Sequence, residues 1–283
     1  MSFFQGRTAV VTGAASGIGL QLSRTLTQRG VRVCLTDINE DAVQAAAAGL
    51  HGAETAVMDV TDASVVQSVV DEFADRHGGL DFLFNNAGIP AGGETHLLTV
   101  EDFNQAIDIN IRGVVNGVTA AYPRMIRQQH GCIVNTASAA GLYPLPLGVP
   151  YSMTKHAVLG LSTSLRMEAE AHGIRVCVLC PTAVETPLLD SQPDQDSAAE
   201  EAGRGLDIRR YLTRLAGPPI AVEGFVKYAL DSVEANRGVI VAPFRARFIR
   251  QLHRFLPAIV EAGTRRALRM EREAAAAESG TGR

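Results

Sequence analysis

Short apolar runs alternate along this chain with segments in which apolar residues recur every three or four positions. The first pattern is typical of strands buried on both faces, and the second of helices with one buried side. The predicted strands cover residues 8–12, 31–37, 55–60, 80–85, 132–136, 175–180 and 238–242. The main predicted helices end at Gly30, begin near Glu40, or cover residues 63–76, 100–129 with an interruption near Gly113, and 151–171. This alternation predicts an α/β fold in which one parallel sheet of seven strands is doubly wound, with helices on both faces.

Two regions depart from the alternation. Residues 191–202 are polar and predict a mobile loop, which leads into a short helix over residues 207–215. A basic amphipathic tail follows Phe244, and we expect its end, residues 274–283, to be disordered. No internal repeat or linker marks a second domain, so the sequence predicts a single domain over residues 1–243 and a helical extension over residues 244–283.

The tail carries an apolar stripe at helical spacing, and arginines alternate with it. The apolar positions are Phe244, Phe248, Leu252, Phe255 and Ile259, and the arginines are Arg247, Arg250 and Arg254. Pro257 can begin a second helix but does not suit the interior of one. The stripe predicts an element for assembly or surface docking. Packing on the chain's own core is about as plausible as contact with another subunit, and peripheral membrane contact is a third alternative.

Composition and charge exclude several classes of protein. The chain has 283 residues, 46% of them hydrophobic and 20% charged, which is ordinary for a globular protein. Its formal net charge of -4 disfavours a nucleic-acid partner. We expect neither a signal peptide nor a transmembrane helix, because the start lacks a basic and apolar leader and no long apolar run occurs.

The four cysteines lie in predicted strands: Cys34, Cys132, Cys177 and Cys180. We interpret them as buried thiols in a reducing, cytoplasmic environment. Cys177 and Cys180 do not suit a metal or redox pair, because residues three apart in a strand point to opposite faces.

A glycine-rich turn connects the first predicted strand to the helix after it. The turn contains Gly13, Ser16, Gly17, Ile18 and Gly19. Glycines allow the backbone to turn tightly and approach a pyrophosphate, which the free N–H groups of a helix N-terminus attract. The order strand, glycine turn, helix is therefore typical of a Rossmann-type dinucleotide-binding fold, although the spacing is G-x-x-x-G-x-G.

With this turn the chain resembles the short-chain dehydrogenase/reductase family. Four further motifs of that family follow in order: Asn85-Asn86-Ala87-Gly88, then Asn110, Ser138, and Tyr151-Ser-Met-Thr-Lys155. The resemblance covers roughly residues 6–243. One departure is that Thr182 follows Pro181 where the family usually has glycine.

The resemblance implies a catalytic set of Asn110, Ser138, Tyr151 and Lys155. Tyr151 and Lys155 are four residues apart and share a helix face. A nearby ammonium and the positive nicotinamide ring favour the phenolate, so we expect a lowered pKa for Tyr151 and a role as general acid/base. Ser138 would stabilise the oxyanion. The family further implies that Lys155 holds the nicotinamide ribose and that Asn110 holds a water of a proton relay.

Asp37 predicts NAD rather than NADP as the cofactor. It ends the second strand, where an acidic residue meets the adenosine ribose, and the neighbouring Ser16 and Ile38 carry no cation for a 2′-phosphate. The alternative is that Asp37 is only a helix cap or a turn residue. The other residues that we expect at the cofactor are Gly13, Gly17, Ile18, Gly19, Asp59, Val60, Asn86, Ala87, Gly88, Tyr151, Lys155, Pro181, Val184 and Thr186.

The loop over residues 139–150 contains no charged residue. It therefore predicts a pocket for a small apolar secondary alcohol or ketone, since no cation is present to anchor a carboxylate or phosphate. The expected substrate residues are Ser138, Leu142, Leu145, Tyr151, Val184 and Leu188. Residues 142–147 could instead pack against a second subunit, and the family suggests a dimer or tetramer. Two other functions stay open: an NADP-dependent ketoreductase, and a regulator that binds the cofactor without catalysis.

Overall fold

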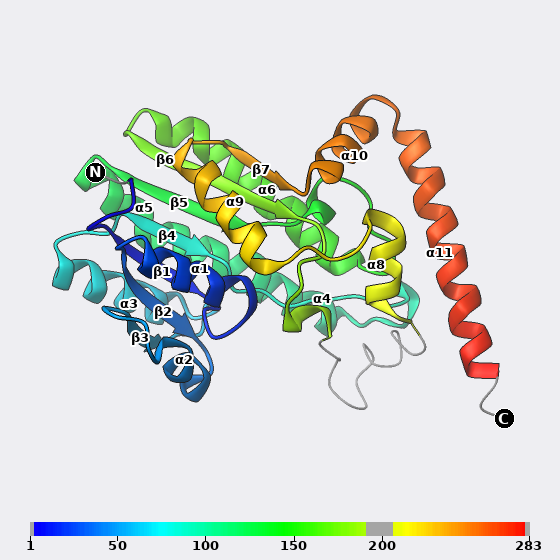
Figure 1. Cartoon of the computed structure of the whole chain (residues 1–283), viewed down its shortest axis with the longest axis horizontal. Coiled ribbons are helices and arrows are strands. Elements are labelled where there is room, and N and C mark those ends of the chain that lie inside the picture. Colours follow the sequence, from blue (N-terminus) through cyan, green and yellow to red (C-terminus); the bar gives the residue numbers. More distant parts are fainter. Residues whose placement is uncertain (1–2, 191–205, 281–283) are drawn as a thin grey trace.

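A computed structural model describes residues 3–190 and 206–280 of the chain. Its centre is one sheet of seven parallel strands in the order β3-β2-β1-β4-β5-β6-β7 (Figure 1). The strands are β1 (Thr8–Thr12), β2 (Arg32–Asp37), β3 (Glu54–Val57), β4 (Phe82–Asn85), β5 (Gly131–Thr136), β6 (Ile174–Pro181) and β7 (Val239–Ala242). The predicted fold class and all seven predicted strands are confirmed.

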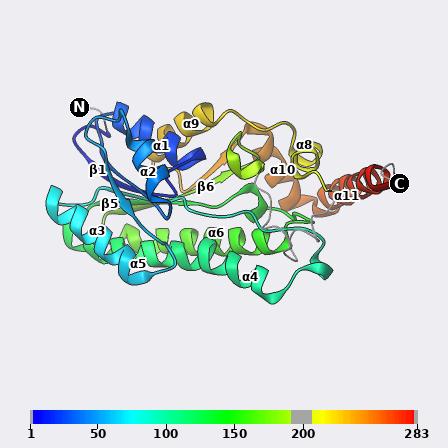
Figure 2. The same ribbon diagram turned by 90° about the horizontal axis from the view of Figure 1, so that it is seen from below.

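Helices cover both faces of this sheet (Figure 2). One layer contains α1 (Gly17–Gln28), α2 (Glu40–Ala47) and α9 (Val222–Glu234). The other contains α3 (Ala63–His77), α5 (Gly113–Gln128) and α6 (Val149–Glu170). Each layer buries its apolar side chains against the strands, which explains why the strand sequences are almost continuously apolar. Within the described residues, no helix has both the length and the apolar composition needed to cross a membrane.

Helix α9 was missed by the sequence prediction, although the chain carries a signal for it. Val222, Phe225, Val226, Ala229 and Val233 recur at helical spacing. Four of the five, all except Val222, are at most 2% exposed in the core beneath α1 and α9. This helix completes the crossover that brings β7 beside β6.

The predicted long helix over residues 100–129 is interrupted, as expected, just before Gly113. Helix α4 (Val100–Ile107) passes into a π-helical turn at Asp108–Arg112, and α5 then begins. Thr99 and Asp102 form a capping box that starts α4. The π-helical turn contains Asn110, and such turns are frequent at functional sites.

The cysteines confirm the expected alternation of strand faces. All four are free and buried. Cys177 packs in the core beneath α1 and α9, whereas Cys180 packs on the opposite face with Val158 of α6.

The carboxyl-terminal helices lie to the right of the sheet in Figure 1, beyond the end of β7. It consists of α8 (Ile208–Ala216), α10 (Phe244–Phe255) and α11 (Pro257–Gly280). The predicted short helix is thus α8, and Pro257 begins a second tail helix as expected. The polar segment 191–202 lies outside the described residues. We expected disorder from residue 274 onward, but α11 continues as a helix to Gly280.

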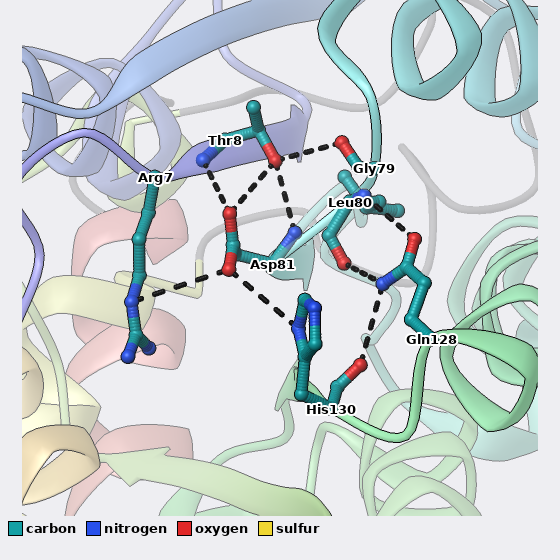
Figure 3. Close-up of polar contacts among 7 residues, drawn as sticks. All are labelled: Arg7, Thr8, Gly79, Leu80, Asp81, Gln128 and His130. Atoms are coloured by element: carbon teal, nitrogen blue, oxygen red, sulfur yellow. Dashed lines mark hydrogen bonds and ion pairs between the residues drawn. The ribbon is translucent and has the colours of Figure 1, made fainter.

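At the amino-terminal edge of the sheet, one polar cluster holds the beginnings of three strands together (Figure 3). The Asp81 carboxylate accepts hydrogen bonds from the Thr8 backbone N–H at 2.9 Å and from the Thr8 hydroxyl at 3.1 Å. It also pairs with Arg7 at 4.0 Å and with His130 at 3.7 Å. The Gln128 side chain donates to the Leu80 carbonyl and accepts from its N–H, both at 2.9 Å. The polar groups of this cluster bond one another, while the functional motifs lie at the opposite, carboxyl ends of the strands.

Candidate active site

Ser138 and Tyr151 come from different elements and are hydrogen-bonded through their side chains. Ser138 follows β5 and caps a 3-10 turn, where its hydroxyl accepts from the Ala140 N–H at 3.1 Å. Tyr151 lies in the first turn of α6, where its N–H donates to the Ala91 carbonyl at 3.3 Å. Ser138 thus caps this turn and also contacts Tyr151.

Among the groups of the chain itself, the net effect is to raise the pKa of Tyr151. The expected lowering included the charge of the nicotinamide ring, so it stays a prediction. Burial is the largest cause, and the hydrogen bond to Ser138 opposes it. The expectation gave weight to the charge of Lys155 and the nicotinamide but none to the loss of water around a phenolate. Ser138 is therefore the group of the protein that most favours the phenolate.

Lys155 lies one helical turn after Tyr151 and is 3% exposed. Its ammonium is 5.3 Å from the centre of the Tyr151 ring and donates to the Thr136 carbonyl at 3.1 Å. Burial lowers its pKa to about 8. The predicted common helix face is confirmed, and Lys155 is held where its charge reaches both Tyr151 and the end of β5.

Asn110 is fully buried within the π-helical turn. Its side-chain oxygen accepts from the Ile89 N–H at 2.9 Å, and its amide donates to the Ile89 carbonyl at 3.0 Å. It also donates to the Thr154 hydroxyl at 3.2 Å. Asn110 thus ties the loop after β4 to the helix of Tyr151 and Lys155, and its predicted water relay stays a prediction.

The glycine turn packs too closely to admit side chains. A Cβ atom on Gly13 would lie 2.8 Å from the Ala87 Cα, and one on Gly19 would lie 2.1 Å from the Gly13 carbonyl oxygen. The Asn86 amide donates to the Thr12 carbonyl at 3.1 Å and fastens the Asn-Asn-Ala-Gly motif to this turn. Ser16 makes no side-chain cap at the start of α1, where the first N–H groups lack intrahelical partners. These features fit a pyrophosphate cradle.

Asp37 lies at the carboxyl end of β2, directly beside the glycine turn. Its carboxylate accepts from the Ala15 N–H at 3.1 Å and from the Asn39 N–H at 3.2 Å. Asn39, not Asp37, caps α2 by accepting from the Ala42 N–H. Asp37 is therefore not the cap of α2, but its bond with the Asn39 N–H two residues on is that of a turn residue, so this part of the alternative stays open. Arg32 begins the same strand and pairs in register with Thr8, so it lies at the opposite end of the strand from Asp37 and the glycine turn.

The remaining predicted cofactor residues border the same edge of the sheet. The Asp59 carboxylate accepts from the Thr61 N–H at 2.8 Å, and Val60 packs against Gly113. A Cβ atom on Gly88 would lie 2.9 Å from the Asn110 side-chain oxygen, so this glycine permits the catalytic groups to approach. The Ser138 hydroxyl donates to the Pro181 carbonyl at 3.5 Å, and the Thr186 hydroxyl donates to the Val184 carbonyl at 3.1 Å.

The predicted substrate residues differ in their exposure, and not all of them are accessible to a substrate. Leu188 is 39% exposed, while Leu142 and Leu145 are partly buried. Val184 is 5% exposed and packs in the main core, so its side chain does not suit a substrate contact. Leu145 and Leu147 pack with Tyr211 of α8 and Ala267 of α11. The loop 142–147 therefore contacts the chain's own carboxyl-terminal helices.

The sequence analysis missed the contribution of the tail to this region. A cavity of about 330 Å³ lies beside the loop that leads to Tyr151, and its lining includes Leu147, Val149, Leu268, Arg272 and Glu94. Arg272 forms a bidentate ion pair with Glu94, with both distances 2.6 Å. The cavity is therefore not free of charge, although its two charges neutralise each other. No local sequence signal could connect residues 178 positions apart.

Comparisons with known proteins agree with this geometry. The family model described as short chain dehydrogenase matches residues 7–197. The 2,5-dichloro-2,5-cyclohexadiene-1,4-diol dehydrogenase of Sphingobium indicum is 39% identical over 203 residues, which are 71% of this chain and 81% of that protein. The 3-oxoacyl-(acyl-carrier-protein) reductase of Thermotoga maritima is 34% identical over 195 residues, 68% of this chain and 79% of the reductase.

Solved structures extend the similarity to almost the whole chain. A short-chain dehydrogenase/reductase from Burkholderia phymatum in complex with NAD has a TM-score of 0.80 and 27% identity, covering 92% of this chain and 96% of its own. A variant of actinorhodin polyketide ketoreductase with NADPH has a TM-score of 0.74 and 27% identity, covering 86% and 97%. The chain belongs to the short-chain dehydrogenase family. It is an oxidoreductase of that family, whose members bind a nicotinamide cofactor and act on hydroxyl or carbonyl groups.

Proposed function

We propose that this chain is an NAD-dependent oxidoreductase that interconverts an apolar secondary alcohol and its ketone. The observation that carries the proposal is the convergence of Ser138, Tyr151 and Lys155, from the end of β5 and the start of α6. The glycine turn and Asp37 lie at the ends of β1 and β2 in the same parallel sheet. Bound NAD supplies the hydride acceptor. Tyr151 takes the hydroxyl proton during oxidation and returns it to the carbonyl oxygen during reduction.

The other members of the set position and polarise the reacting oxygen. Ser138 donates a hydrogen bond to it and favours the phenolate form of Tyr151. Lys155 contributes a positive charge and would hold the nicotinamide ribose. Asn110 bonds both the loop that follows β4 and helix α6, and so fixes their relative position. A regulator without catalysis would not need all four residues, which disfavours that alternative.

Asp37 supports NAD over NADP, because its carboxylate faces the glycine turn and the neighbouring Ser16 and Ile38 carry no cation to receive a 2′-phosphate. The family contains structures with either cofactor. The substrate class rests on the uncharged loop over residues 139–150. The Sphingobium relative is named for a chlorinated cyclic diol, which is consistent with an apolar secondary alcohol. We further propose a homo-oligomer in the cytoplasm, the latter supported by four free, buried thiols.

The test of the proposal is Tyr151→Phe, assayed with NAD and a panel of apolar secondary alcohols by absorbance of the reduced cofactor. The ring still packs, but the group that transfers the proton is lost. Turnover should fall by about 10²–10⁴-fold. The dissociation constant for NAD should stay within about twofold, because the glycine turn and Asp37 are untouched. Near-normal turnover of this variant would refute the assignment of Tyr151.

A further inference from the structure

Helix α10 presents an apolar stripe that nothing in the described chain covers. Phe244, Phe248 and Phe255 are 73%, 62% and 74% exposed. Leu256 and Ile259, where α11 begins, extend this surface, and we refer to these five residues as the α10 stripe. Ala246, on the opposite side of α10, is fully buried in the core. The helix therefore packs on its small residue and points its large apolar residues outward, which contradicts the alternative that the stripe covers the chain's own core.

Positive charge accompanies the α10 stripe. Residues 244–259 contain four arginines and no aspartate or glutamate, in a chain whose net charge is -4. The guanidinium of Arg247 lies 5.1 Å from the centre of the Phe244 ring, and that of Arg254 lies 5.9 Å from the Phe255 ring. No carboxylate among the described residues pairs with either arginine. Exposed rings and unneutralised cations thus occur together on one helix.

We propose that α10 and the start of α11 form a peripheral docking surface for an anionic lipid bilayer. The aromatic rings would enter the boundary between headgroups and acyl chains, and the flanking arginines would pair with lipid phosphates. A ridge of side chains on a single helix suits a flat surface. Figure 1 shows α10 at the periphery of the molecule, between β7 and α11. The inference does not depend on the proposed catalytic function.

Charge also distinguishes the bilayer from a second copy of this chain. In a two-fold contact the same patch is buried on both copies, so a contact centred on the α10 stripe gathers the arginines of both copies in one interface. Like charges that face each other in an interface oppose association. An anionic surface instead neutralises the arginines while it accepts the rings.

The experiment measures co-sedimentation of the full chain with vesicles of phosphatidylcholine alone and of phosphatidylcholine with phosphatidylglycerol. We expect binding to the anionic vesicles, weaker binding to the neutral ones, and a decrease as salt is added. Arg247→Gln/Arg254→Gln should weaken binding by about fivefold for each arginine removed. Phe248→Ser/Phe255→Ser should weaken it by roughly tenfold or more.

Matched controls remove the same groups elsewhere on the surface. Arg24→Gln/Arg127→Gln changes the net charge equally, and Met167→Ser removes an apolar side chain that is 66% exposed on α6. Both should bind vesicles like the unaltered chain. The proposal is overturned if the full chain binds neither vesicle, or if the controls weaken binding as much as the α10 variants. It is also overturned if the phenylalanine variant only lowers the oligomeric mass and leaves vesicle binding unchanged.

Discussion

Burial moves the ionisation of Tyr151 and Lys155 in opposite directions. A phenolate and an ammonium both lose water in the same buried environment, so the tyrosine pKa rises while the lysine pKa falls to about 8. A side-chain hydrogen bond between Ser138 and Tyr151 opposes this effect at Tyr151. Within the chain, Ser138 therefore regulates how readily Tyr151 becomes a base.

Ser138→Ala should shift the pH dependence of alcohol oxidation. Oxidation requires the phenolate, so kcat/KM should rise with pH through the pKa of Tyr151. Loss of the hydrogen bond raises that pKa further, which moves the rising limb to higher pH. At neutral pH, kcat should also fall by about 10²-fold because an oxyanion donor is lost. Ser152→Ala is the matched control, since its hydroxyl donates to the Ala140 carbonyl and contacts His156 Nδ1 at 3.5 Å rather than Tyr151. A limb at unchanged pH would show that Ser138 does not tune Tyr151.

Asp37 should decide the choice of cofactor. A 2′-phosphate beside its carboxylate would place like charges in contact and remove a ribose donor, so specificity for NAD should exceed that for NADP by more than about a hundredfold. Asp37→Ala should reduce this ratio, mainly by weakening NAD. Asp41→Ala, which removes an exposed carboxylate at the start of α2, should leave the ratio unchanged. Steady-state kinetics with both cofactors measures it, and equal specificity constants in the unaltered enzyme would refute the role of Asp37.

Among the elements, α8 and α11 are joined by a carboxylate that has no exposure to solvent. Glu271 of α11 pairs with Arg210 at 2.7 Å and with Arg214 at 2.8 Å, and it accepts from the Asp207 N–H at 3.0 Å. Burial alone would raise the pKa of Glu271, but the hydrogen bonds from Arg210 and Asp207 and the two positive charges outweigh it, and the pKa is lowered. The tail is thus fastened over the helix that follows the polar segment 191–202.

Glu271→Gln should loosen α11 without unfolding the sheet. The substitution keeps the shape but removes the charge that faces two arginines, and hydrogen bonds to charged groups contribute about 1.5–3 kcal/mol. Amide hydrogen exchange in α11 should accelerate by about 10–100-fold. Glu261→Gln, in an exposed pair with Arg265 on the same helix, should change little.

The same contact should weaken in acid. Because the pKa of Glu271 is depressed in the folded state, its stabilisation is present above the ordinary glutamate value of about 4.3. It is lost as the pH falls from there through the lower folded value. The protection factors of α11 in the unaltered chain, which correct for the intrinsic amide exchange rate at each pH, should therefore fall below about pH 4. Equal exchange in the variant and the unaltered chain at neutral pH would show that Glu271 does not hold the helix.

At the scale of the whole molecule, the parallel sheet explains why so much could be predicted from sequence. All strands end at one edge, so motifs as distant as Gly13 and Tyr151 meet there once the strand order is known. What could not be predicted depends on packing between distant segments. The sequence left Asp37 open as the cap of α2, and only the hydrogen bonds identify Asn39 instead. The burial of Val184 required the isolated bridge to Ile220.

The tail shows this limit most clearly. Its helical spacing and the start at Pro257 were predictable, because both depend on local sequence. The direction of its apolar stripe was not, because Ala246 rather than the phenylalanines packs on the core. The contacts of Glu271 and Arg272 with α8 and Glu94 join positions with no common pattern.

Truncation of the chain after Leu256 should weaken substrate binding but leave cofactor binding unchanged. This truncation keeps α10 in place but removes Leu268 and Arg272 from the cavity beside Leu147, and it removes the carboxylate that holds α8. If this region binds the alcohol, KM for the alcohol should rise about tenfold, equivalent to about 1.4 kcal/mol. The dissociation constant for NAD should stay within about twofold, because the glycine turn and Asp37 lie on β1, α1 and β2. A chain that ends at Gly280 is the control and should behave like the full chain. If the shorter chain keeps both constants and the exchange protection of α8, then α11 takes no part in the substrate site.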